Sequence, residues 1–100
     1  MSEPNSHNSH SLKEIFKALV KTPGIRKSYL RIVAKETWAD KMGPLVTSHT
    51  RSLSLRKGIL TVRVNSDALR HELTYNREKI IQFMNEGFGE ELVSEVRITN

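Results

Sequence analysis

The segment from residue 50 to residue 64 constrains the fold more than any other part of the sequence. Apolar and polar residues alternate from Thr50 to Lys57 and again from Ile59 to Val64. This alternation is typical of strands with one buried face. Lys57, at the end of the first run, and Gly58 join the two runs, and two residues suffice for a tight turn. The sequence therefore predicts a β-hairpin with an aliphatic core face and an outer face of hydroxyls and arginines.

Two helical stretches precede the hairpin. Ser11 begins a Ser-x-x-Glu capping box, and apolar residues recur behind it at helical spacing as far as Val20. Turn residues then end this helix, and a second helix is expected over residues 25–42. Gly43-Pro44 interrupts or kinks the second helix before a further turn.

A long third helix and a last strand follow the hairpin. Ser66, or the asparagine before it, caps a helix that ends at Gly87 and Gly89. Residues 92–99 alternate again and predict a third strand. The fold class is therefore α+β and KH-like, with the order α-α-β-β-α-β and a three-stranded sheet backed by helices. The residues expected in the core are Trp38, Leu53, Leu55, Leu60, Val62, Val64, Leu69, Leu73, Ile80, Val96 and Ile98.

The chain length and composition point to one small domain. A length of 100 residues fits a single core. Residues 1–10 are polar and are interpreted as a disordered N-terminal arm, which leaves a single domain over residues 11–100. The absence of cysteine excludes disulfides, zinc fingers and thiol catalysis. The first residues lack the pattern of a signal peptide, so we expect a cytoplasmic protein, associated with the nucleoid if it binds DNA.

Charge is segregated along the chain. Residues 11–63 carry twelve basic and three acidic side chains, whereas residues 64–100 carry four basic and seven acidic ones. Cations spaced along a surface suit contacts to phosphates, so the sequence predicts nucleic-acid binding. The predicted sheet has no outward Phe or Tyr, which favours contacts to the backbone over base stacking. The candidate nucleic-acid-binding residues are Lys13, Lys17, Lys27, Arg31, Lys35, Arg51, Arg56, Lys57 and Arg63.

Enzyme chemistry finds little support. The sequence has neither a phosphate-binding P-loop nor a G-x-G-x-x-G turn. His49 and His71 are isolated, and His49 is expected to hydrogen-bond to backbone at a helix end. We therefore expect no catalytic residues, no cofactor, no metal and no small-molecule substrate. The glycines include no G-x-x-G clamp of the KH type, so a KH-like domain here would bind in another way.

A family resemblance extends these inferences. It rests on Trp38, Gly43, residues 45–50 (LVTSHT), residues 55–62 (LRKGILTV), and the S-x-A-L-x-x-E-L pattern from Ser66 to Leu73. In this combination the sequence resembles the bacterial DciA family, an operator of the replicative helicase whose members are also described as possible RNA-binding proteins. The resemblance implies a KH-like domain that binds DNA and the replicative helicase and that has no catalytic residues.

Three functions remain open at this point. The first is a non-enzymatic nucleic-acid-binding accessory protein in DNA replication. The second is a protein-interaction module whose basic face docks an acidic protein partner, and the third is an RNA-binding protein. Reversing the charges of Arg56 and Arg63 separates the first two, because only the first predicts lost DNA binding. None of the three involves a membrane.

Overall fold

The computed structural model describes residues 14, 15, 17–19 and 21–100. The chain divides into two compact units, Met1–Leu30 and Arg31–Asn100. The predicted arm, Ser11 of the capping box and Lys13 lie outside the described residues. The single domain over residues 11–100 stays a prediction.

The described residues of the first unit are helical up to Leu19. Thr22 N donates a hydrogen bond to Leu19 O, so the predicted end of this helix is confirmed. Helix α2 (Pro23–Ser48) begins at its proline, two residues earlier than predicted. Proline suits the first turn of a helix because its missing N–H would have no partner there. The apolar stripe remains exposed at Ile15.

Gly43 produces a kink inside α2. Its φ of 83° and ψ of 173° lie outside the helical region, in a conformation that glycine adopts at little cost. The Thr47 hydroxyl donates to Gly43 O at 2.7 Å, across the first turn after the kink. The helix then continues from Pro44 to Ser48, so the predicted interruption and the further turn are both confirmed.

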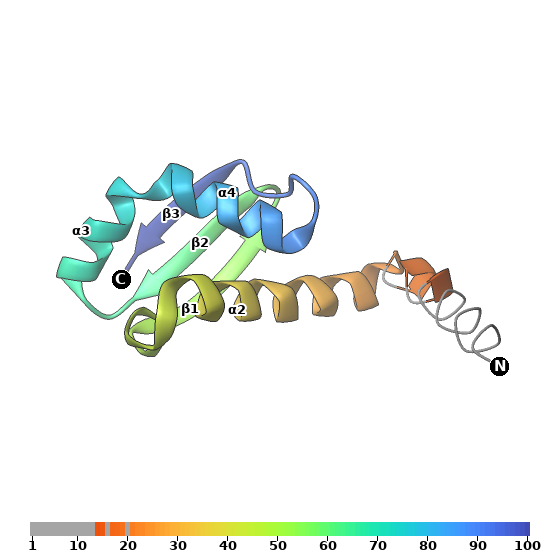
Figure 1. Ribbon diagram of the computed structural model, residues 1–100, viewed down its shortest axis with the longest axis horizontal. Coiled ribbons are helices and arrows are strands. Elements are labelled where there is room, and N and C mark those ends of the chain that lie inside the picture. Colours follow the sequence, from red (N-terminus) through yellow and green to blue (C-terminus); the bar gives the residue numbers. More distant parts are fainter. Residues whose placement is uncertain (1–13, 16, 20) are drawn as a thin grey trace, which may run out of the picture. The chain divides into compact units, whose positions relative to one another are not determined.

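Three strands form one mixed sheet (Figure 1). Strands β1 (Thr50–Arg56) and β2 (Ile59–Val64) pair antiparallel, and β3 (Glu95–Thr99) pairs with β2 in parallel. Lys57 and Gly58 have φ values of 50° and 81°, as a two-residue hairpin turn requires. The predicted hairpin is confirmed, and the last strand begins at Glu95 instead of residue 92.

Two helices connect the parallel strands where the sequence predicted one. Helix α3 (Asp67–Tyr75) begins after Ser66, whose hydroxyl accepts the N–H of Leu69 at 3.2 Å, so the predicted cap is confirmed. Helix α4 (Arg77–Phe88) follows after Asn76. The prediction of a continuous helix is wrong because the Asn76 side chain donates to Glu72 O at 3.0 Å and ends α3.

The loop from α4 to β3 is held by one side chain. Asn85 Oδ1 accepts the N–H groups of Leu92 at 3.0 Å and Val93 at 2.8 Å. Its Nδ2 donates to Val93 O at 3.0 Å. These bonds use the backbone groups of residues that were predicted to be strand, which explains why β3 starts later.

The two glycines at the end of α4 have different roles. Gly89 adopts φ 73° and donates its N–H to Asn85 O and Glu86 O, so it is the helix stop that was predicted. Gly87 lies inside α4, where a Cβ would meet Thr37 Oγ1 of α2 at 2.3 Å. A residue without a side chain is therefore required for the close approach of α4 to α2.

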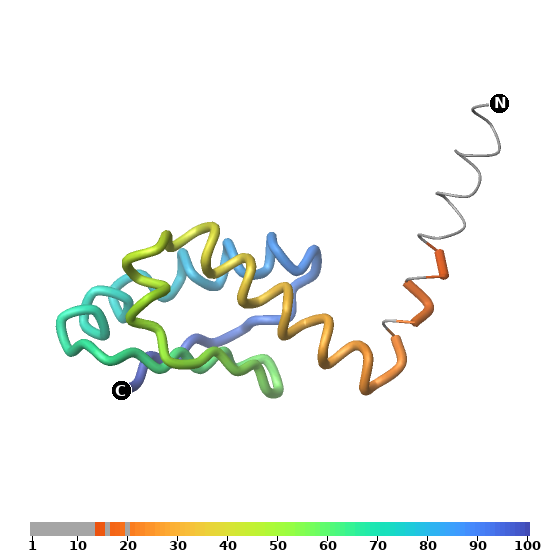
Figure 2. Tube along the Cα trace, turned by 90° about the horizontal axis from the view of Figure 1, so that it is seen from below, coloured from red at the N-terminus to blue at the C-terminus, as the bar shows by residue number. Residues whose placement is uncertain are grey.

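The helices cover one face of the sheet. Figure 2 shows α3, α4 and residues 31–48 of α2 on the same side of the strands. Trp38 is 1% exposed between these layers. Its Nε1 donates to Thr50 Oγ1 at 3.0 Å, and that hydroxyl donates to Val46 O at 2.8 Å. The expected burial of the tryptophan is therefore confirmed.

The core agrees with most of the predicted residues. Leu60, Val62 and Val64 of the central strand are 0% exposed. Four predicted core residues are only half-buried, because they lie at the margins of the small sheet and of α3: Leu53, Leu55, Leu69 and Ile98. The other buried apolar residues are Ala34, Trp38, Leu73, Ile80, Met84, Phe88, Val93 and Val96.

Candidate nucleic-acid interface

The face of the sheet that the helices leave open carries arginines and hydroxyls. Because paired residues share a face, the register gives this surface three rows across the strands. Leu60, Val62 and Val96 are buried on the helical side, so the residues that alternate with them along the strands point to this open surface. Its rows are Ser52, Arg63 and Thr99; Ser54, Thr61 and Arg97; and Arg56, Ile59 and Glu95. We call these nine residues the open sheet face.

Three arginines give the open sheet face its charge. Arg63 and Arg97 are exposed on neighbouring strands. Arg97 lies two residues before Thr99, the partner of Arg63, so the Cα atoms of the two arginines are about 7–8 Å apart. Arg56 pairs with Ile59, and Ile59 lies four residues before Arg63 on β2. Arg56 is therefore about 13 Å from Arg63 along the strand direction. Guanidinium groups bind phosphate with two parallel hydrogen bonds, and the row hydroxyls can donate to the same oxygens.

Arg97 is a residue that the sequence analysis did not select. It lies in the acidic third of the chain, but the parallel pairing sets it opposite Thr61, beside Arg63. The signal that could have found it was the alternation of the last strand. Its Nε donates to Glu95 Oε2 at 2.7 Å, with both side chains at least half exposed. An exposed pair of this kind contributes only about 0–1 kcal/mol, so phosphate can compete for the arginine.

Two further predicted cations lie at the ends of β1. Arg51 is exposed at a bulge, where the register shifts between Thr50 and Ser52. Lys57 is exposed in the hairpin turn. Both therefore flank the open sheet face without belonging to its rows.

Two of the remaining predicted cations lie on the other side of the sheet from these arginines. Arg31 and Lys35 are exposed on α2, in the layer on the other side of the sheet. Lys17 and Lys27 are exposed in the first unit. Lys13 lies outside the described residues. The open sheet face thus contains two of the nine predicted cations, Arg56 and Arg63.

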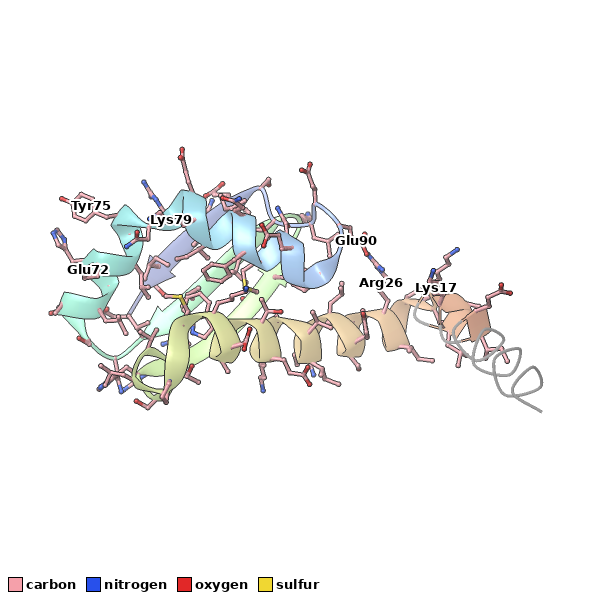
Figure 3. The ribbon with its side chains drawn as sticks, in the orientation of Figure 1. Lys17, Arg26, Glu72, Tyr75, Lys79 and Glu90 are labelled. Atoms are coloured by element: carbon pink, nitrogen blue, oxygen red, sulfur yellow. The ribbon has the colours of Figure 1, made fainter. Side chains whose placement is uncertain are left out.

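The helical layer has the opposite charge balance. Residues 67–91 hold six acidic and three basic side chains. Figure 3 labels three of them: Glu72 on α3, Lys79 on α4, and Glu90 after α4. Arg70 is 3.9 Å from Asp67, so part of the positive charge is paired. The segregation of charge along the sequence is therefore only partly a segregation between the two faces of the second unit, because Arg31 and Lys35 lie in the helical layer.

The two central histidines make different contacts. His49 is exposed, and its Nδ1 lies 2.8 Å from Asn65 Oδ1. The expectation of a side-chain bond to backbone is therefore wrong, although His49 O does accept the N–H of Asn65. His71 meets the ring of Tyr75 edge-on, with centroids 5.0 Å apart. In the described part of the chain, no three His, Asp or Glu residues are grouped as metal ligands would be.

The described helices do not include one that is long and apolar enough to cross a membrane.

Comparison with protein families gives a match to the family described as "Dna[CI] antecedent, DciA", over residues 11–98. No curated protein matches the chain.

Proposed function

The chain belongs to the DciA family, and from this membership we propose that it is a non-enzymatic nucleic-acid-binding accessory protein that acts in DNA replication with the replicative helicase. The family match spans nearly the whole chain, as the resemblance in the sequence suggested. The fold is α+β with a three-stranded mixed sheet. We further propose that this α+β domain is KH-like. KH domains are a recurrent nucleic-acid-binding module, which agrees with the proposed function.

The observation that carries nucleic-acid binding is the charge of the open sheet face. Arg56, Arg63 and Arg97 lie on one surface with four hydroxyls, and Glu95 is its single acidic residue. Each arginine that neutralises a phosphate releases counterions, which favours binding at low salt. The nine residues of this face include no aromatic side chain for base stacking. The proposed contacts are therefore to the sugar-phosphate backbone, with little selection among sequences.

The other layer is left for a protein partner. Residues 67–91, which comprise α3, α4 and the start of the following loop, hold six acidic and three basic side chains, a balance that would repel phosphate. A domain that holds DNA on its sheet can therefore contact the helicase through its helices at the same time. We place this activity in the cytoplasm, on nucleoid DNA.

The test is fluorescence anisotropy with labelled single-stranded DNA, duplex DNA and single-stranded RNA at several salt concentrations. Three arginines contacting a single strand predict that log K falls with log salt with a slope of about −2. Arg63→Glu should weaken binding and make this slope less negative. Arg70→Glu is the matched control, because it changes the net charge equally but lies on α3.

The outcomes separate the candidate functions. Equal losses in the two variants would show that only net charge matters, and the open sheet face would be rejected as the site. Absence of binding even at low salt would reject nucleic-acid binding and leave the acidic protein partner. Tighter binding of RNA than of either DNA would favour an RNA-binding protein.

A further inference from the structure

Strand β1 has an unpaired outer edge. The strand order is β1-β2-β3, and β1 pairs with β2 alone among the described strands. The two-residue turn makes Arg56 and Ile59 a hydrogen-bonded pair, and such pairs alternate along an antiparallel ladder with pairs whose backbone groups point outward. The N–H and C=O groups of Leu53 and Leu55 therefore point away from β2. A further strand would bind to these groups.

The apolar layer under the sheet is incomplete at the same edge. Leu53 lies opposite Val62, and Leu55 lies opposite Leu60. The two β2 residues are 0% exposed, whereas the leucines of β1 are only half-buried. Apolar side chains on a further strand would cover the exposed parts of the leucines, and removal of apolar surface from water favours association.

The charges at this edge select the occupant. Arg51 and Arg56 are exposed at the two ends of β1, and Lys57 is exposed in the turn. Residues 41–66 contain no acidic side chain. Two copies of β1 would meet with like charges, whereas an acidic strand would be attracted. We propose that the outer edge of β1 binds an extended, acidic segment of a partner protein as a fourth strand, with alternate apolar side chains against Leu53 and Leu55.

The probe for this site is a labelled heptapeptide of sequence Glu-Val-Glu-Val-Glu-Val-Glu, titrated into the full chain. Binding should be weakened about tenfold or more when every peptide nitrogen is methylated, because this change removes the donors and keeps the side chains. Amide exchange measured by NMR should show new protection at Leu53 and Leu55. The amides of Ser52 and Ser54, which face β2, should change little.

Variants separate this site from the open sheet face. Leu55→Pro removes an outward N–H and no bond to β2, so it should abolish peptide binding and leave DNA binding intact. Leu55→Val keeps the N–H and is the matched control. Arg97 lies on β3, the strand at the opposite edge of the sheet from β1. The variant Arg97→Glu should therefore lose DNA binding and retain peptide binding. Failure of one proposal is thus distinguishable from failure of the other.

Three results would overturn the proposal that β1 binds a fourth strand. One is absence of peptide binding at millimolar concentration. Another is equal binding of the methylated peptide, which would show that charge alone attracts it. The third is strong protection of the Leu53 and Leu55 amides in the free protein, because the edge would then already be occupied. If Leu55→Pro does not fold, the methylated peptide and the exchange data on the unaltered chain still decide the question.

Discussion

Removal of the Asn85 side chain should destabilise the protein more than its half-buried position suggests. Asn85→Ala eliminates three hydrogen bonds to the loop before β3, with lengths of 2.8–3.0 Å. At about 1 kcal/mol each, their loss lowers the free energy of unfolding by about 3 kcal/mol. This is a large part of the roughly 5–15 kcal/mol that stabilises a typical domain.

The measurement is urea unfolding followed by the fluorescence of Trp38, the only tryptophan in the chain. For a domain of this size, a loss of 3 kcal/mol corresponds to a fall in Tm of roughly 10–20 °C. Asn85→Asp keeps the two accepted bonds and loses the donor, so its loss should be intermediate. Gln82→Ala, at an exposed position of the same helix, is the control and should change stability by less than about 0.5 kcal/mol.

A loss below about 1 kcal/mol for Asn85→Ala would refute this reasoning, since an unsatisfied buried backbone group costs at least that much. It would mean that water replaces the side chain without penalty. A loss equal to that of Asn85→Asp would show that only the bond to Val93 O matters.

Three other predictions concern packing and binding. Gly87→Ala should lower Tm, because its Cβ would lie 2.3 Å from Thr37 Oγ1, whereas Gly24→Ala, with nothing within 4 Å, should leave Tm unchanged or raise it. Trp38→Phe should cost at least about 1 kcal/mol in unfolding followed by circular dichroism, because the bond to Thr50 and part of the ring volume are lost. Arg63→Glu should weaken single-stranded DNA binding and make the slope of log K against log salt less negative by about 0.7; an unchanged slope would show that Arg63 contacts no phosphate.

Features that depend on neighbouring residues could be predicted from the sequence. The hairpin follows from alternation and from a lysine-glycine turn, and its observed register puts Leu55 opposite Leu60 as the pattern requires. The kink at Gly43 and the cap at Ser66 likewise depend on residues a few positions apart. In each case the deciding interaction is local, so the sequence pattern contains it.

Features that depend on distant residues could not be predicted in the same way. The break at Asn76 is a competition between a side chain and a helical carbonyl, and asparagine also occurs within helices. The parallel pairing of β2 with β3 joins segments separated by two helices, and it alone brings Arg97 beside Arg63. The sequence analysis therefore selected Arg56 and Arg63 of the open sheet face but not Arg97, and the cations that it selected on α2 lie in the other layer.

The parallel pairing of β2 with β3 also sets an order of events in folding. The hairpin closes a two-residue loop and can form in about 1–10 μs, whereas the contact of Ser94 with Gly58 spans 36 residues that include α3 and α4, so we expect it to form later. Until β3 docks, β2 has an uncovered edge, and a chain in this state is open to pairing with another copy. Slow docking of β3 would thus appear as concentration-dependent loss of refolding yield.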